Sequence, residues 1–243
     1  MNVSQKTVLI TGANRGIGRA LVEEALARGA KIVYAGTRNG KIDIADKRVT
    51  PLALDVTDQA QTQWAAREVP SLDVLVNNAG ISLYERLEDA DLIAQIMAVN
   101  FYGILNVTRA FLPQLKQSKG AIVNNLSLAG VAPLPMIPAY SASKAAALSI
   151  TQSFRMLLKS QSVSVHAAII GPTETDMTTG LHIPKNAAAA TAAGIYDGLM
   201  NGEEDIFPDP ASQMAAQGWR NGIAKALEQQ FFGLVQPSAV ETA

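Results

Sequence analysis

Short apolar runs alternate along the chain with longer stretches in which apolar residues recur at helical spacing. The short runs predict strands covered on both faces, and the longer stretches predict amphipathic helices. We expect strands at Thr7–Thr11 and at residues 31–35, 49–55, 72–77, 121–126 and 163–170. We expect helices at residues 17–28, 59–67, 89–112 and 139–160, with Pro113 bending or ending the third of them.

The pattern loosens after Gly171. Residues 173–185 have no clear period and are expected to form a loop over the site, within a substrate-loop region spanning residues 173–205. A helix at 186–201, a short strand at 206–207 and a last helix at 222–234 are expected to complete the chain. Alternating strands and helices predict an α/β fold: a doubly wound parallel sheet of Rossmann type, in three layers and one domain over residues 1–243.

Composition narrows the functional classes. The chain has 243 residues, 48% of them hydrophobic and 17% charged, which suits one globular domain. There is no cysteine and there are two histidines, so neither a thiolate site nor a metal site is expected. The net charge of −1 does not favour nucleic acid. The first apolar run is too short for a signal-peptide core, and we expect no membrane span and a cytoplasmic location.

A glycine-rich turn separates the first predicted strand from the first predicted helix. Residues 11–18 read T-G-A-N-R-G-I-G. Glycines at such a turn let the backbone approach a pyrophosphate, and the N-terminus of the helix supplies free N–H groups and the positive end of its dipole. We therefore predict a dinucleotide site formed by the following residues of the turn: Gly12, Asn14, Arg15, Gly16, Ile17 and Gly18.

A second motif lies at the start of the helix predicted at 139–160. Tyr140 and Lys144 are four residues apart and so share one face of that helix. An ammonium beside a phenol stabilises the phenolate, so we expect the pKa of Tyr140 to be lowered toward neutrality. Ser127, at the end of the fifth strand, is placed to bind a substrate carbonyl oxygen, and Asn100 lies within the third helix.

The T-G-x-x-x-G-x-G turn and the Y-x-x-x-K motif resemble those of the short-chain dehydrogenase/reductase family, over residues 5–177. The resemblance implies an oxidoreductase with Asn100, Ser127, Tyr140 and Lys144 as catalytic residues. It also implies that Lys144 binds the nicotinamide ribose and that Asn100 holds a water. Further cofactor contacts are implied at these positions: Asp55 and Val56 for adenine; Asn78, Ala79 and Gly80 from the N-N-A-G motif; Tyr140 and Lys144; and Gly171, Thr173 and Thr175.

Two positions depart from the family pattern. The family has two adjacent serines where this chain reads Leu126-Ser127, and the serine retained is the one implied to act in catalysis. The family has Pro-Gly where this chain has Ile170-Gly171, so the backbone there is expected to differ locally.

The choice of cofactor depends on the end of the second strand. NAD-binding folds carry an acidic residue there, which bonds the ribose hydroxyls. This chain has no acid at that point and has Arg38 instead, with Arg15 in the glycine turn. Two guanidinium groups would hold a 2′-phosphate, so we expect NADP(H).

The expected function is reduction of a hydrophobic ketone or aldehyde to an alcohol, or the reverse. The expected pocket walls are apolar: Leu128, Leu134, Met136, Ile137, Met177 and Leu181. His182 is expected in an exposed loop and His166 in the core. Two alternatives remain: an epimerase or dehydratase on the same fold, with Glu174 and Asp176 as possible acid–base groups, or an NADP(H)-binding sensor or scaffold without turnover.

The family commonly forms dimers or tetramers through its two long helices, so a homodimer or homotetramer is expected. The following residues on the two predicted helices fit either an interface or the core: Phe101, Leu105, Phe111, Ile150, Phe154 and Leu157.

Overall fold

The sheet is the frame of the molecule. The computed structural model describes residues 1–233. All strand pairs in the sheet are parallel, and the strand order is β3-β2-β1-β4-β5-β6-β7. The strands are β1 (Thr7–Thr11), β2 (Ile32–Thr37), β3 (Val49–Ala53), β4 (Val74–Asn77), β5 (Ala121–Asn125), β6 (Ser164–Ala168) and β7 (Asp205–Ile206). The order reverses between β1 and β4, and a cleft that binds ligands is expected at the carboxyl ends of these two strands.

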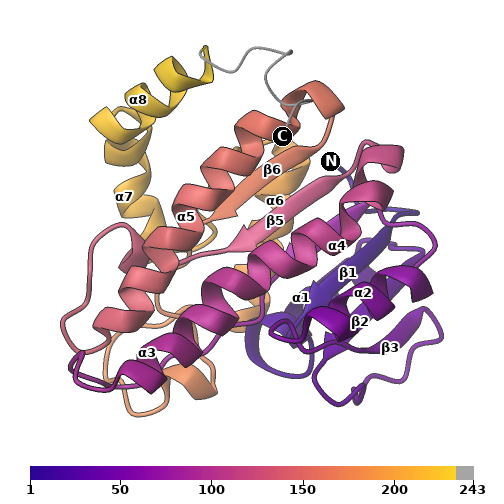
Figure 1. Ribbon diagram of the computed structural model, residues 1–243, viewed down its shortest axis with the longest axis horizontal. Helices are drawn as coiled ribbons and strands as arrows, with labels where there is room; N and C mark the ends of the chain where they lie inside the picture. The colour runs from indigo at the N-terminus through magenta and orange to yellow at the C-terminus, as the bar shows by residue number, and fades with distance from the viewer. Residues whose placement is uncertain (234–243) are drawn as a thin grey trace.

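Helices cover both faces of this sheet, as Figure 1 shows. They are α1 (Gly16–Ala27), α2 (Gln59–Glu68), α3 (Ala90–Met97), α4 (Gly103–Ser118), α5 (Pro138–Leu158), α6 (Ala188–Asn201), α7 (Pro210–Arg220) and α8 (Ile223–Phe232). One core lies between the sheet and α1 with α6; a second lies between the sheet and α2, α4 and α5. The predicted three-layer, doubly wound fold is confirmed.

Strand β1 illustrates why the inner strands carry runs of apolar residues. Val8 and Ile10 pack into the core beneath α1 and α6, whereas Leu9 packs into the core beneath α4. All three side chains are fully buried. Because both faces are covered, a polar residue at any of these positions would be buried without water.

The third predicted helix is longer than expected. It consists of α3, a π-helical turn η1 (Ala98–Tyr102) and α4, and α4 continues past Pro113 to Ser118. The expectation that the helix could end at Pro113 was therefore wrong. Pro113 is exposed, and the buried side chains of Phe111 and Leu115 on either side of it hold the helix on the sheet. Packing therefore outweighs the one backbone hydrogen bond that proline removes.

The same helical stretch, Ala90–Ser118, is long and apolar enough to cross a membrane by length and composition. This differs from the expectation that no segment would meet such a criterion. One helix of this kind is weak evidence for a membrane span, because helices of soluble proteins pass the same test. In this fold the stretch contacts α2 and α5 and carries the buried, hydrogen-bonded Asn100 at its centre.

Helix α7 was not predicted from the sequence. Its N-cap is Asp209, whose side chain accepts a hydrogen bond from the Ser212 amide at 2.9 Å, and Pro210 occupies the first turn. The Ser212 hydroxyl reaches back toward the Asp209 amide, which completes a capping box. This Asp-Pro-x-Ser pattern is a signal for a helix start that the hydrophobic periodicity alone does not reveal.

A buried group of charges ties the last helices to the sheet. Arg155 of α5 forms ion pairs with Asp205 of β7 and Glu228 of α8. Lys225 of α8 pairs with the same two carboxylates, at 2.8 and 3.0 Å. The indole of Trp219 in α7 donates a hydrogen bond to Asp205 at 2.9 Å. One ion-pair network therefore holds α5, β7 and α8 together, and α7 is bonded to it.

Candidate active site

The glycine turn is built by close backbone packing. Gly12 and Gly16 have φ angles of +64° and +53°, in the left-handed region that favours glycine. A Cβ atom on Gly18 would lie 2.0 Å from the Gly12 carbonyl oxygen, so no side chain fits there. The turn therefore needs glycine at all three positions for backbone reasons.

The N-terminus of α1 has no side-chain cap. Arg15 is its N-cap residue and makes no capping hydrogen bond, and the first turn contains no acidic residue. The amide groups of the first turn and the positive end of the dipole therefore lack an acceptor from a side-chain cap. Together with the close-packed glycines, this donor set fits the pyrophosphate of a nicotinamide cofactor.

The N-N-A-G segment braces this turn. The Asn78 side-chain nitrogen donates to the carbonyls of Thr11 and Gly12, at 2.9 and 3.2 Å. The Asn78 side-chain oxygen accepts from the amide of Asn125, at the end of β5, at 2.9 Å. The Thr11 hydroxyl accepts from the backbone amides of Asn78 and Ala79, both at 3.0 Å. These hydrogen bonds join the carboxyl ends of β1, β4 and β5.

The residues expected to bind the adenosine half of the cofactor differ in their contacts. Arg15 forms an exposed ion pair with Asp176 at 2.9 Å, which joins it to the segment after β6. Arg38 follows β2 directly and is exposed. Asp55 accepts hydrogen bonds from the amide and hydroxyl of Thr57, at 2.9 and 2.7 Å, and the neighbouring Val56 is buried.

The segment after β6 is tied to both sides of the cleft. Gly171 is packed against Asp209, which accepts its amide at 2.8 Å, and a Cβ on Gly171 would lie 2.4 Å from that carboxylate. Thr173 is buried and its hydroxyl donates to the Gly171 carbonyl at 3.2 Å. Thr175 lies against Gly16: a Cβ atom added to Gly16 would be 3.1 Å from the Thr175 methyl group. The loop over the site thus meets the glycine turn at Thr175.

The four predicted catalytic residues come from three segments. Tyr140 and Lys144 lie on α5, Ser127 lies between β5 and the short 3-10 helix η2 (Leu128–Gly130), and Asn100 lies in η1. The Lys144 ammonium is 5.7 Å from the centroid of the Tyr140 ring and donates to the Asn125 carbonyl at 2.7 Å. The structure therefore places the lysine beside the tyrosine ring, and the Ser127 hydroxyl lies near enough to the phenol to affect its pKa.

Asn100 is fully buried, and its amide joins two parts of the site. Its nitrogen donates to the Ile81 carbonyl and to the Ser143 hydroxyl, both at 2.9 Å, and its oxygen accepts from the Ile81 amide at 2.9 Å. A Cβ on Gly80 would be 3.3 Å from that oxygen and 3.7 Å from the Lys144 nitrogen. The amide nitrogen of Asn100 is fully used, so a water could bind only its oxygen or its backbone.

Burial controls the two titrating groups. Burial raises the pKa of the Tyr140 phenol above 10.0, and hydrogen bonding with the Ser127 hydroxyl acts in the opposite direction. Burial lowers the pKa of Lys144 to about 8. The expected lowering of the pKa of Tyr140 was therefore wrong. Removal of water disfavours the charged phenolate, and this effect holds the pKa of the Tyr140 phenol above its ordinary value.

The predicted pocket walls are all at least partly exposed. Leu134, Met136 and Met177 expose about half of their surface, at 46%, 50% and 48%, so they are not core residues. His182 is exposed, as expected. His166 is buried in β6, where its ring nitrogens contact the Glu203 carbonyl at 2.6 Å and the Ser164 hydroxyl at 3.0 Å, which confirms its place in the core.

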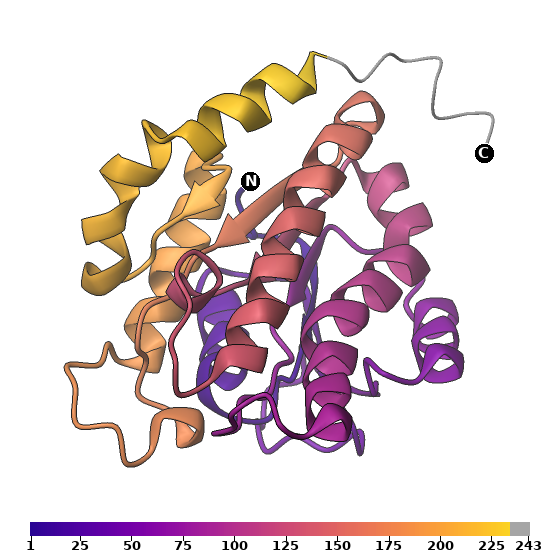
Figure 2. The same ribbon diagram turned by 60° about the vertical axis from the view of Figure 1, so that its left-hand side comes forward.

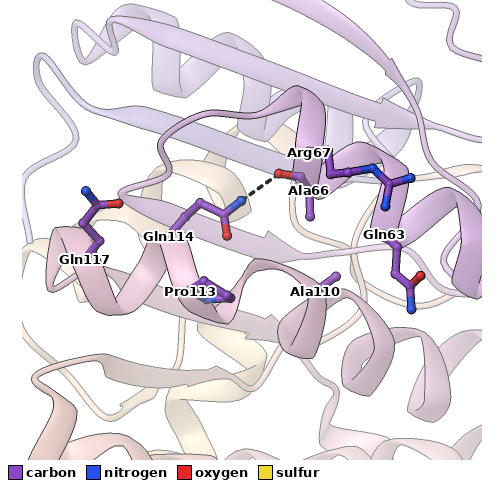
Figure 3. A pocket seen from close by; sticks show the side chains of 7 residues that line it. All are labelled: Gln63, Ala66, Arg67, Ala110, Pro113, Gln114 and Gln117. Atoms are coloured by element: carbon purple, nitrogen blue, oxygen red, sulfur yellow. Dashed lines mark hydrogen bonds between the residues drawn. The ribbon is translucent and has the colours of Figure 1, made fainter.

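A groove of about 460 Å³ lies elsewhere, between α2 and α4, and is drawn in Figure 3. Glutamine side chains line it, and Gln114 spans it by donating to the Ala66 carbonyl at 2.7 Å. None of the residues that line this groove belongs to the predicted site. Within residues 1–233, histidines and carboxylates do not form a group of three that could hold a metal ion.

Sequence reasoning missed three residues that shape the site. Asn125 links Asn78 to Lys144, Ser143 is the second partner of Asn100, and Gly130 lies where η2 crosses α5. A Cβ on Gly130 would lie 2.7 Å from the Lys144 backbone, so glycine is needed there. These contacts join residues 14 to 47 positions apart, and no local pattern signals them.

Comparison with known proteins identifies the family. A model of the short chain dehydrogenase family matches residues 6–185, which is most of the chain. This protein belongs to the short-chain dehydrogenase family, a family of oxidoreductases whose fold binds a nicotinamide cofactor.

Individual relatives agree with this assignment. The chain is 36% identical to 11-beta-hydroxysteroid dehydrogenase 1A of Arabidopsis thaliana, over 92% of this chain and 67% of that protein. It is 33% identical to the 3-oxoacyl-(acyl-carrier-protein) reductase FabG of Thermotoga maritima, over 85% and 89%. A short chain dehydrogenase from Burkholderia cenocepacia, solved in complex with NADP, is similar at a TM-score of 0.87 and 35% identity, over 98% and 100%.

Proposed function

We propose that this oxidoreductase is an NADPH-dependent carbonyl reductase that converts a hydrophobic ketone or aldehyde to an alcohol. The reverse reaction would make it an alcohol dehydrogenase. The observation that carries the proposal is a chain of contacts: Lys144 lies 5.7 Å from the Tyr140 ring and donates to the Asn125 carbonyl. The side chain of Asn125 in turn donates to Asn78, which is bonded to the glycine turn. That arrangement suits proton transfer to an oxygen that gains negative charge.

The residues divide the work as follows. The glycine turn and the N-terminus of α1 would hold the pyrophosphate, and Lys144 would bind the nicotinamide ribose. The bound nicotinamide would supply the hydride. Ser127 would donate a hydrogen bond to the substrate oxygen, and Tyr140 would donate its proton to that oxygen. Because burial keeps the pKa of the Tyr140 phenol high, the proton is available at neutral pH.

The preference for NADPH is supported by Arg38 at the end of β2, where no acidic residue takes its place. A neighbour at 35% identity was solved with NADP. A 2′-phosphate would be held by a guanidinium with charge-assisted bonds that a ribose hydroxyl does not offer. The apolar, half-exposed walls near Leu134, Met136 and Met177 support a hydrophobic substrate.

One experiment separates this proposal from its alternatives. NADPH and NADH are each titrated by fluorescence, and a panel of aromatic and aliphatic ketones is then added while NADPH absorbance is followed. We expect tighter binding of NADPH than of NADH, and loss of absorbance with some ketones. Binding without consumption would support a sensor or scaffold. Conversion of a substrate without net NADPH consumption would support an epimerase or dehydratase.

We also propose that the protein is a cytoplasmic homodimer or homotetramer that uses the outer faces of α4 and α5. Leu157 on α5 is 41% exposed, and Phe101 is partly exposed, so both are available for an interface. Phe111, on the inner face of α4, is fully buried and belongs to the core. Light scattering gives the mass in solution, and a monomer would refute this proposal.

A further inference from the structure

The catalytic helix α5 begins without a cap of its own. Its N-cap residue, Ile137, makes no side-chain capping bond, and its first turn contains no acidic residue. The buried amide of Ala139 instead donates to the Glu85 carboxylate at 2.7 Å. Glu85 lies 54 positions earlier, in the segment that follows β4. The cap of the helix that carries Tyr140 therefore comes from a distant loop, and it binds one residue before the tyrosine.

The same carboxylate shapes its own loop. Its second oxygen accepts from the amide of Leu87 at 2.5 Å. Leu87 has a φ of +64°, in the left-handed region that a branched side chain rarely adopts. An unfavourable turn is thus stabilised by a charge-assisted hydrogen bond, and loss of that bond would release the turn.

The loop of residues 81–88 is held at three points. Ile81 is bonded in both directions to Asn100, and Asp89 caps α3 by accepting from the Leu92 amide at 2.9 Å. Glu85 is the point between them, and it alone of the three reaches α5. The starts of α3 and α5 lie at the same end of the molecule in both views (Figures 1 and 2), and the two helices contact each other.

The loop presents apolar side chains to the outside. Leu83, Tyr84 and Leu87 are 46%, 65% and 57% exposed. On the α5 side of the Glu85 bond, Leu134 and Met136 are also exposed. Glu85 thus joins two apolar segments next to the tyrosine, and neither segment is covered by the rest of residues 1–233.

We propose that Glu85 is a positioning residue for this site. Its carboxylate sets the start of α5 beside Tyr140 and holds residues 81–87 as one wall of the cleft that receives an apolar substrate. This inference rests on the proposed function, because it assigns a role in binding the carbonyl substrate. Glu85 touches backbone amides and not the reacting atoms, so its effect passes through the loop and the helix.

The test uses three variants of the full chain. Glu85→Ala removes both acceptor oxygens, Glu85→Gln keeps one, and Glu88→Gln is the matched control, an exposed glutamate in the same loop. For each we would measure kcat and KM for a ketone substrate, Kd for NADPH by fluorescence, and amide hydrogen exchange at Ala139 and residues 82–88. The melting temperature shows whether each variant is folded.

For Glu85→Ala we expect exchange at Ala139 to become faster, KM to rise about tenfold and Kd for NADPH to stay within twofold, since a hydrogen bond to a charged group is lost away from the cofactor cradle. Glu85→Gln should recover part of the KM, and Glu88→Gln should match the wild type. Unchanged exchange, or a parallel loss of NADPH binding and activity, would overturn the proposal. Absence of turnover in the wild type would refute the proposed function instead, and the exchange rates would still decide whether Glu85 holds the loop.

Discussion

Replacing Arg155 with methionine should destabilise the protein strongly. The guanidinium is buried, at 6% exposure. It donates to the Val165 carbonyl at 3.0 Å, to the Glu204 carbonyl at 2.7 Å and to the Asp205 carboxylate at 2.8 Å, and it also pairs with Glu228. Methionine fills much of the volume but satisfies none of these acceptors.

The magnitude follows from counting the buried charges. The side chains of Asp205 and Glu228 are 3% and 6% exposed, and the two cations facing them are Arg155 and Lys225, at 6% and 9%. After the substitution, two buried carboxylates share one ammonium. Breaking a buried pair in this way costs about 3–5 kcal/mol. For a domain of this length that corresponds to a fall in Tm of about 6–20 °C.

The assay is urea unfolding followed by tryptophan fluorescence. Trp219 donates to Asp205 and so reports on this network, and a Trp64→Phe background removes the other indole. The double variant Arg155→Met/Glu228→Gln should be more stable than the single variant, because it removes the uncompensated carboxylate. Turnover below the Tm should stay within about twofold of wild type, since Arg155 lies fifteen positions after Tyr140 on the same helix, a rise of about 22 Å.

The pH dependence has a definite sign. Burial raises the pKa of Asp205, but Arg155 and Lys225 outweigh it and lower that pKa below 3.8. The stability that this carboxylate contributes is therefore present above pH 3.8 and is lost as the pH falls through the lower folded value. The difference between wild type and Arg155→Met should be full at neutral pH and narrow in acid. A loss below about 1 kcal/mol at pH 7, or a double variant no better than the single one, would refute the reasoning.

Three further predictions concern the site. Tyr140→Phe should lower kcat by a factor of about 10²–10⁴ and leave NADPH binding unchanged. The control Tyr102→Phe, at an exposed tyrosine, should have no effect. A near-normal kcat for Tyr140→Phe would show that Tyr140 is not the proton donor. Burial lowers the pKa of Lys144 to about 8, so the unfolded chain binds more protons than the folded protein between pH 8 and 10.5. The free energy of unfolding of the wild type relative to Lys144→Met should therefore rise by about 3 kcal/mol as the pH increases across that window. A difference in urea titrations that does not change with pH would contradict this. Asp176→Asn releases Arg15 from an exposed ion pair and should tighten NADPH binding by up to about fivefold without changing NADH binding, and an equal effect on both cofactors would show that Arg15 does not select the phosphate.

The sequence by itself determined the fold and the local geometry of two motifs in the candidate site. The inner strands of the sheet carry apolar runs because helices cover both of their faces, so these runs show in the sequence where the strands lie. The glycines at 12, 16 and 18 are explained by backbone geometry and by a contact within the turn, and Tyr140 and Lys144 are explained by one helical repeat. These features depend on neighbours within a few positions, and local spacing records them.

Only the tertiary structure decided the remaining features. The continuation of α4 past Pro113 depends on the sheet beneath Phe111 and Leu115. The pKa of the Tyr140 phenol depends on how much water the assembled site excludes, and burial reversed the shift that the nearby lysine predicted. The Glu85 cap on α5 joins residues 54 positions apart. Desolvation and long-range hydrogen bonds depend on which distant segments come into contact in the folded chain. No local pattern in the sequence specifies these tertiary contacts.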